Sequence, residues 1–208
     1  MLPALFFIML STFHKCTSEV QISFHYVSFI WPSRFCRTKN CTNSAPPYFT
    51  IHGLWPSRSN NTSIVDCQGP IRNYGEIQPL VPRLTLYWPS YTHRRTLSWR
   101  HEWNHHGKCS RLTLARYFRA GLYLLNFRSD LLDALHNAGI NERSSDGNQY
   151  TIFNYLTALR NRFRHEVQLR CRDDLNGVIF LTGVNLCVDL NYHVISCPIY
   201  TWLRFMEQ

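Results

Sequence analysis

The order of the apolar patterns along this chain constrains its fold more than any other feature. Near the N-terminus, apolar residues alternate with polar ones over Val20–Tyr26, which predicts a strand with one buried face. The middle of the chain repeats apolar residues at helical spacing, and the last part returns to strand-like runs. The expected helices are Leu114–Leu125, Asp130–Ala138 (capped by Ser129) and Ile152–Phe163, and the expected later strands are Val167–Cys171, Val178–Leu190 and Val194–Cys197.

Strands on both sides of a helical middle predict an α+β fold, because alternating strand–helix units are needed for a parallel sheet. We therefore expect an antiparallel sheet packed against several helices. The chain has 208 residues, which is enough for one domain with a sizeable core. Cys36 and Cys41 bracket a short basic loop and are well placed for a local disulfide, and Cys187 and Cys197 are placed to bridge the last hairpin.

The cysteine content indicates where the protein is found. Eight cysteines are too many for a typical cytosolic enzyme and point to an oxidising compartment. Leu2–Leu10 is apolar apart from Pro3 and too short to span a bilayer, and small residues at positions 16 and 18 suit a cleavage site. We expect residues 1–18 to be a signal peptide and residues 19–208 the mature domain; a buried N-terminal strand is the alternative. No later apolar run is long enough to cross a membrane, so a soluble, secreted, extracellular protein is expected.

The charge and the glycosylation sequons agree with this expectation. The formal net charge is +9 and the pI is about 9.3, which suggests an anionic partner such as nucleic acid. A merely soluble basic protein is the alternative. Asn60 and Asn61 begin two overlapping sequons, and Asn40 begins a third, so these asparagines are candidates for glycosylation in a secretory pathway.

A cluster of titratable residues within Trp99–Cys109 is the strongest functional feature. His101, Glu102, His105 and His106 stand at i, i+1, i+4 and i+5, so a helix would place all four on one face. The same residues match the H-E-x-x-H pattern of zinc hydrolases, in which two histidines bind the metal and the glutamate is the base. No later segment offers a third ligand at a known spacing, so zinc is the minor alternative.

A second segment, Phe49–Pro56, supports an alternative to zinc chemistry. It places His52 between a short strand and a glycine turn, with Trp55 close by. One histidine here and a histidine–glutamate face on the other segment supply a pair for general acid–base catalysis. RNA suits a basic protein of this kind, because its own 2′-hydroxyl is the nucleophile. Neither a metal nor a cofactor is then required.

These two segments, their order and the Trp31-Pro32 and His-Gly-Lys-Cys-Ser elements resemble the T2 ribonuclease family. The resemblance extends over most of residues 20–200, and with the basic charge it is nearest to the self-incompatibility ribonucleases (S-RNases) of flowering plants, rose-family type. It implies an endoribonuclease that cleaves single-stranded RNA through a 2′,3′-cyclic phosphate. His106 would take the proton of the 2′-hydroxyl, and His52 would protonate the leaving 5′-oxygen.

The resemblance also implies roles for the residues around this pair. Glu102 and the cation beside it would stabilise the phosphorane, and His101 would hydrogen-bond the phosphate. Trp55 and Tyr48 are candidate stacking platforms for a base. The partners implied are RNA and, for a self-incompatibility protein, pollen F-box proteins; a monomer is expected. The alternatives are a defence or phosphate-scavenging ribonuclease, and a weakly active recognition protein on the same scaffold.

Three departures from the family bear on this function. His105 stands where relatives have lysine, so at neutral pH this position is expected to supply only part of a positive charge. Ile30 replaces a glutamine linked to base binding. The family pattern also pairs Cys67 with Cys109, and relatives carry one more cysteine near the C-terminus that this chain lacks. Cys171 is therefore expected to be a buried free thiol or an intermolecular link.

Overall fold

The computed structural model describes residues 21–37, 39–70, 72–92, 95–141, 150–173 and 179–198. The predicted signal peptide, residues 1–18, lies outside this part of the chain. No helix in the described part is both long and apolar enough to span a membrane.

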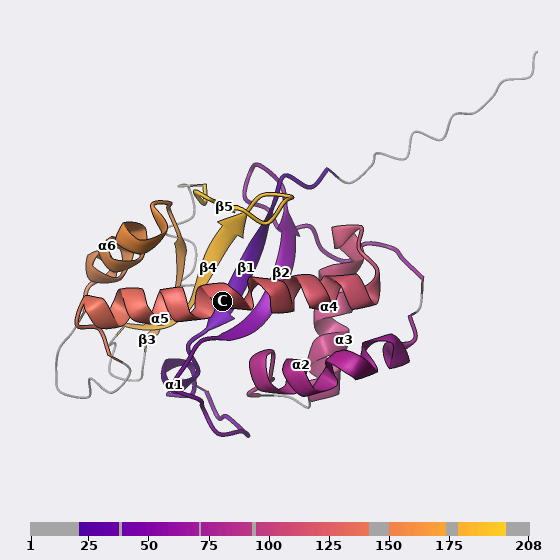
Figure 1. The fold of residues 1–208 in the computed structure, drawn as a ribbon, viewed down its shortest axis with the longest axis horizontal. Coiled ribbons are helices and arrows are strands. Elements are labelled where there is room, and N and C mark those ends of the chain that lie inside the picture. The colour runs from indigo at the N-terminus through magenta and orange to yellow at the C-terminus, as the bar shows by residue number, and fades with distance from the viewer. Residues whose placement is uncertain are drawn as a thin grey trace, which may run out of the picture.

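An antiparallel sheet forms the centre of the molecule (Figure 1). Its strands are β1 (Phe24–Ile30), β2 (Thr50–Ser57), β3 (Gln168–Asp173), β4 (Ile179–Val188) and β5 (Val194–Ile195). The strand order is β2-β1-β4-β3, and β5 adds to β4. Strands from both ends of the chain thus lie side by side. The predicted α+β class with an antiparallel sheet is confirmed.

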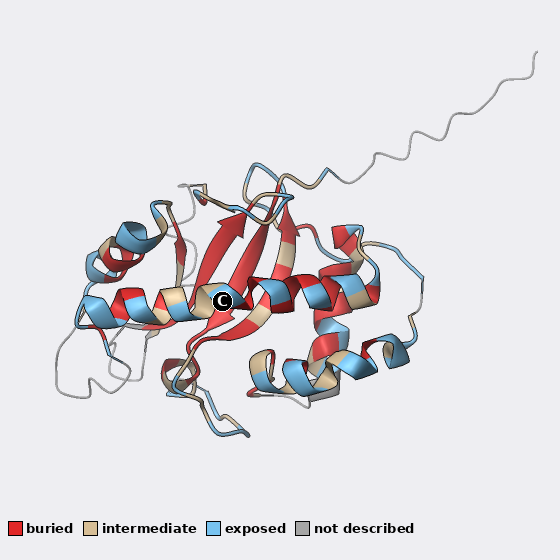
Figure 2. Ribbon diagram, in the orientation of Figure 1, coloured by how far each residue is buried: buried red, intermediate tan, exposed pale blue. Residues whose placement is uncertain are grey.

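The helices come from the middle of the chain. They are α1 (Pro32–Phe35), α2 (Val81–Tyr87), α3 (Arg95–His105), α4 (Leu114–Tyr123), α5 (Phe127–Asn137) and α6 (Ile152–Phe163), with short 3₁₀ turns η1 (Tyr74–Leu80), η2 (Gly107–Ser110) and η3 (Leu124–Asn126). In Figure 1, α4 and α5 run end to end across one face of the sheet. Figure 2 shows their buried stripes facing it, as the apolar spacing predicts.

Two local predictions were wrong. The first strand was expected to bury one face, but every residue of β1 is buried. It lies between β2 and β4, and both its faces are covered. The helix expected at Asp130 begins at Phe127, because η3 leads into it directly from α4. Ser129 is therefore inside the first turn, where its hydroxyl donates to the carbonyl of Asn126 at 3.1 Å, and it is not the cap.

Three disulfides staple this fold, as expected: Cys36–Cys41, Cys67–Cys109 and Cys187–Cys197. The second joins the loop before η1 to the end of the histidine-bearing segment. Cys171 is free in the structure, and burial raises the pKa of its thiol to about 11. Cys16 lies outside the described residues.

Candidate active site

His52 lies at an irregularity in the pairing of β1 with β2. The pairing of β1 with β2 shifts between Ser28 and Phe29, which face Gly53 and Ile51, so His52 is the extra residue of a β-bulge. Bulges re-aim side chains and are frequent at active sites. The carbonyl of His52 accepts instead from the indole nitrogen of Trp88 at 2.7 Å. This bond fixes the backbone at the point where the strand pairing fails.

The other segment, Trp99–Cys109, contains the end of helix α3. Helix α3 finishes at His105, and His106 leaves helical geometry with φ −120° while its N–H still donates to the carbonyl of Glu102 at 3.0 Å. Gly107 follows with no room for a side chain, because a Cβ there would overlap the ring of Trp103. The glycine thus lets the chain pass close to Trp103 just after the helix ends.

Glu102 is the buried centre of the site, with only 3% of its surface exposed. Its Oε2 accepts from the indole nitrogen of Trp55 at 3.0 Å, and its Oε1 lies 4.0 Å from Nε2 of His52. A Cβ at position 53 would overlap both Trp55 and this carboxyl group, which explains why glycine follows His52. Burial raises the pKa of Glu102 to about 8, against the opposing effects of Trp55 and Arg170.

Trp55 lies between the two histidines of the predicted catalytic pair. Its ring centre is 5.2 Å from that of His52 and 5.2 Å from that of His106. On the helix side, the rings of His101 and His105 stack at 5.2 Å, and His105 meets His106 edge-on at 4.6 Å. The structure therefore brings together the predicted residues His52, Glu102, His101, His105 and His106.

The two predicted catalytic histidines are both held neutral in the free protein. Burial, with smaller effects from His105 and His101, lowers the pKa of His106 to about 3. Packing around His52 lowers its pKa well below the usual range, and the charges of Arg170, His106 and His101 act in the same direction. A neutral histidine accepts a proton, so this state suits a general base better than a general acid.

Two charged residues at the site, Asp66 and Arg170, were not predicted from the sequence. Asp66 carries a carboxylate whose Oδ1 lies 2.6 Å from Nδ1 of His105, and the Cys67–Cys109 disulfide holds this loop in place. Arg170, on β3, contacts Nδ1 of His52 and donates to the hydroxyl of Ser28 at 2.9 Å.

Arg170 also lies over the ring of Trp55, with its guanidinium carbon 5.5 Å from the ring centre. The sequence offered one signal for it: a lone arginine inside the predicted strand Val167–Cys171.

A cleft of about 430 Å³ opens beside His52, His101 and Glu102. Its other lining residues are mostly apolar or hydroxylic: Ile30, Phe35, Pro89, Ser90, Tyr91, Thr92, Leu97 and Ser98. Tyr48 does not line it. The guanidinium of Arg128 lies over its ring at 4.9 Å and over that of Tyr87 at 4.6 Å.

The H-E-x-x-H residues are not arranged as a zinc site. Glu102 turns away from the stacked rings of His101 and His105 to meet Trp55. Across the described residues, no group of three or more histidine, cysteine, aspartate or glutamate side chains is arranged to hold a metal ion.

Two histidines from separate segments lie together, with a buried carboxyl group between those segments, at a cleft that His52 lines, and this arrangement suits general acid–base catalysis. The chain belongs to the Ribonuclease T2 family, whose model matches residues 22–197. It is 30% identical to the extracellular ribonuclease LE of Solanum lycopersicum, over 93% of this chain and 90% of that protein. It is 31% identical to ribonuclease S-7 of Nicotiana alata, over 87% of this chain and 85% of that protein.

A solved structure agrees with the family. RNase NT in complex with 5′-AMP matches with a TM-score of 0.75 and 32% identity, over 86% of this chain and 92% of that one. The protein is therefore a T2-family endoribonuclease. These relatives do not single out the rose-family self-incompatibility type, which stays a prediction.

Proposed function

We propose that this ribonuclease cleaves single-stranded RNA by acid–base transphosphorylation through a 2′,3′-cyclic phosphate. The observation that carries the proposal is the placement of His52 and His106 on either side of Trp55, with Glu102 buried between their segments. Each member of such a pair contributes about 10²- to 10⁴-fold to the rate. Neither step requires a metal or a cofactor.

The roles follow from the electrostatics of the site. His106, with its pKa lowered to about 3, is neutral at physiological pH and takes the proton of the 2′-hydroxyl. His52 gives a proton to the leaving 5′-oxygen. Glu102, with a pKa of about 8, keeps its proton at neutral pH and can donate it in a hydrogen bond to the phosphorane. His101 and His105 complete the phosphate site.

The base subsite is the cleft beside His52. Ile30, Tyr91 and Leu97 give it apolar walls for the face of a base. Trp55 is engaged through its indole nitrogen by Glu102, yet its ring remains a candidate platform. Tyr48 keeps that role only as a prediction, since it lies beneath Arg128 and outside the cleft.

The biological role proposed is that of the style-side determinant of gametophytic self-incompatibility, with pollen F-box proteins as partners of a secreted, monomeric glycoprotein. The basic charge and the similarity to ribonuclease S-7 support it. Removal of residues 1–18 takes away Lys15 and no acidic residue, so the mature chain stays strongly basic. The similarity to an extracellular ribonuclease supports the alternative of a defence or phosphate-scavenging enzyme. Pistil expression together with allelic variability of residues 57–75 distinguishes the two.

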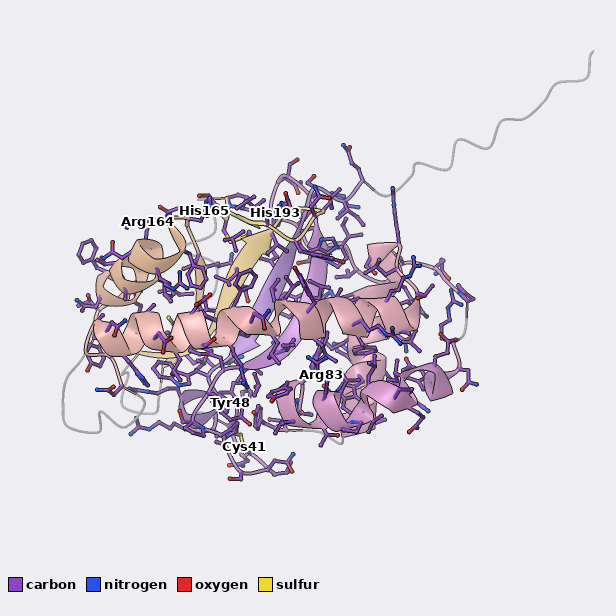
Figure 3. The ribbon with its side chains drawn as sticks, in the orientation of Figure 1. Cys41, Tyr48, Arg83, Arg164, His165 and His193 are labelled. Carbon is purple, nitrogen blue, oxygen red and sulfur yellow. A yellow bond between two sulfur atoms is a disulfide. The ribbon has the colours of Figure 1, made fainter. Side chains whose placement is uncertain are left out.

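Single substitutions test the mechanism. We expect His52→Ala and His106→Ala each to abolish release of acid-soluble nucleotides from RNA, while circular dichroism shows the fold intact. Arg83→Ala is the matched control, because Arg83 is an exposed residue of α2, outside the cleft (Figure 3). A fully active variant at either histidine refutes the mechanism, and a wild-type rate near that of the variants favours a recognition protein.

A further inference from the structure

Arg170 reaches the catalytic centre from the far edge of the sheet. It belongs to β3, whereas His52 belongs to β2, and β4 and β1 lie between them. Its partner across the strands is Gly183 of β4. The long side chain of Arg170 crosses β4 and reaches Ser28 on β1 and then His52.

The contact with His52 has a chemical consequence. A guanidinium can only donate hydrogen bonds, so the nitrogen that it contacts, Nδ1 of His52, must be the acceptor and carry no proton. An imidazolium has protons on both nitrogens and offers no acceptor. The position of Arg170 in the free protein therefore excludes the protonated form of His52.

The other groups around His52 do not reverse this effect. His101 and His106 on the helix side oppose a positive charge on its ring. Glu102 lies 4.0 Å away, but its raised pKa keeps it uncharged at neutral pH. A general acid nevertheless needs a proton to give. Arg170 must therefore leave Nδ1 before His52 can act in the proposed mechanism.

The reacting phosphate is the group that can bring this about. It is an anion that must lie within reach of both His52 and His106, and it accepts charge-assisted hydrogen bonds from a guanidinium and from an imidazolium at once. We propose that Arg170 is a ligand of this phosphate, and that its guanidinium rests on Nδ1 of His52 until the substrate draws it away.

Protons balance in this scheme, which rests on the proposed role of His52. When phosphate binds, His52 takes up one proton from solvent. That proton leaves with the 5′-oxygen, and His106 receives the proton of the 2′-hydroxyl. The site thus becomes competent as an acid only when an anionic phosphate is present.

The test follows His52 directly in the full-length mature protein. The histidine rings are labelled with ¹⁵N, the signal of His52 is assigned from its loss in His52→Gln, and its titration is recorded with and without inorganic phosphate. In the wild type, we expect saturating phosphate to move the midpoint upward by about one pH unit or more.

In Arg170→Met, the midpoint is expected to be already higher without phosphate, and phosphate affinity to fall about tenfold, the effect of losing one charged hydrogen bond. Arg170→Lys keeps the charge and should bind phosphate with intermediate affinity. Arg83→Met, which removes a charge from an exposed residue of α2 outside the cleft, should match the wild type.

The proposal is wrong if phosphate leaves the wild-type titration unmoved, or if Arg170→Met binds phosphate as tightly as the wild type. Should Arg170→Met fail to fold, the wild type and Arg170→Lys decide. None of these readouts depends on turnover. An active His52→Ala variant would overturn the proposed mechanism. It would not decide whether Arg170 binds phosphate, which the titration and the phosphate affinity decide separately.

Discussion

The protonation state of Glu102 leads to a sharp prediction about the pH dependence of the reaction. The side chain is 3% exposed, its Oε2 accepts from Trp55, and its Oε1 faces His52. With a pKa of about 8, it is a neutral acid at physiological pH, and its proton can point toward the phosphate. Glutamine has the same shape, is neutral at every pH, and can donate from its amide nitrogen in the same direction.

The size of the effect follows from the pKa. A group with a pKa of about 8 is about 90% protonated at pH 7 and about 10% protonated at pH 9. In the wild type, the fraction of molecules in which residue 102 can donate a hydrogen bond therefore falls about tenfold over this range, whereas in Glu102→Gln it does not change. The ratio of kcat/KM for Glu102→Gln to that of the wild type should therefore rise about tenfold between pH 7 and pH 9. Any titration of His52 or His106 common to both proteins cancels in the ratio.

The assay is cleavage of one dinucleotide, because kcat/KM reports the ionisation of the free enzyme. At pH 7, Glu102→Gln should retain a rate within about tenfold of the wild type, whereas Glu102→Ala should lose about 10²- to 10³-fold. Glu76→Gln, an exposed acid outside the cleft, is the matched control and should give a flat ratio. A flat ratio for Glu102→Gln would refute this reasoning, because it would show that Glu102 does not change its protonation state between pH 7 and pH 9.

Three further predictions follow from other residues. His105→Lys should raise the rate about tenfold at pH 7 and less at pH 5, because a lysine amine keeps its positive charge over this whole range, whereas an ordinary imidazole loses its charge near pH 6.5; superimposed pH–rate profiles would contradict this. His25→Gln should remove an acid-induced loss of stability. Burial lowers the pKa of His25 to about 4, so below about pH 6.5 the unfolded state binds a proton that the native state does not. Between pH 7 and pH 4.5, the wild type should therefore lose about 2 kcal/mol more than the variant in urea unfolding. In material secreted from plant cells, Asn60→Gln should abolish the glycan at the overlapping sequons and Asn61→Gln should leave it, as judged by peptide mass, because the amide nitrogen of Asn61 donates to a backbone carbonyl whereas Asn60 is exposed.

Much of the fold could be predicted because its signals are local. The helices predicted at Leu114–Leu125 and Ile152–Phe163 are present as α4, which continues into η3, and as α6. At the start of α6, however, Ile152 and Phe153 are exposed. The extra burial of β1 could not be read in this way. Alternation reports how one strand divides its faces, but the covering of both faces depends on elements far away in the sequence.

The site, like the fold, has features that local sequence predicts and features that depend on distant parts of the chain. His52, Glu102 and His106 stand in two short segments whose composition already indicates acid–base chemistry. The bulge that presents His52 depends on a register between two strands, and a register has no pattern within either strand.

The charges that regulate the site were the least accessible to sequence reasoning. Asp66 is 39 residues from its partner His105, and Arg170 is 118 residues from His52. Nothing in the sequence around Asp66 distinguishes it from an ordinary exposed charge, and the one signal for Arg170 is its place inside a predicted strand.

Their effects are nevertheless of opposite kind. Asp66 places a carboxylate against His105, whereas Arg170 places a guanidinium against His52 and excludes a proton from its Nδ1, so the free enzyme has an acidic neighbour at one side of the phosphate site and a neutral histidine at the other. An incoming phosphate changes both conditions at once, because it adds negative charge between them. The pH dependence of this enzyme should consequently differ between its free and substrate-bound forms more than that of an otherwise similar site without Arg170.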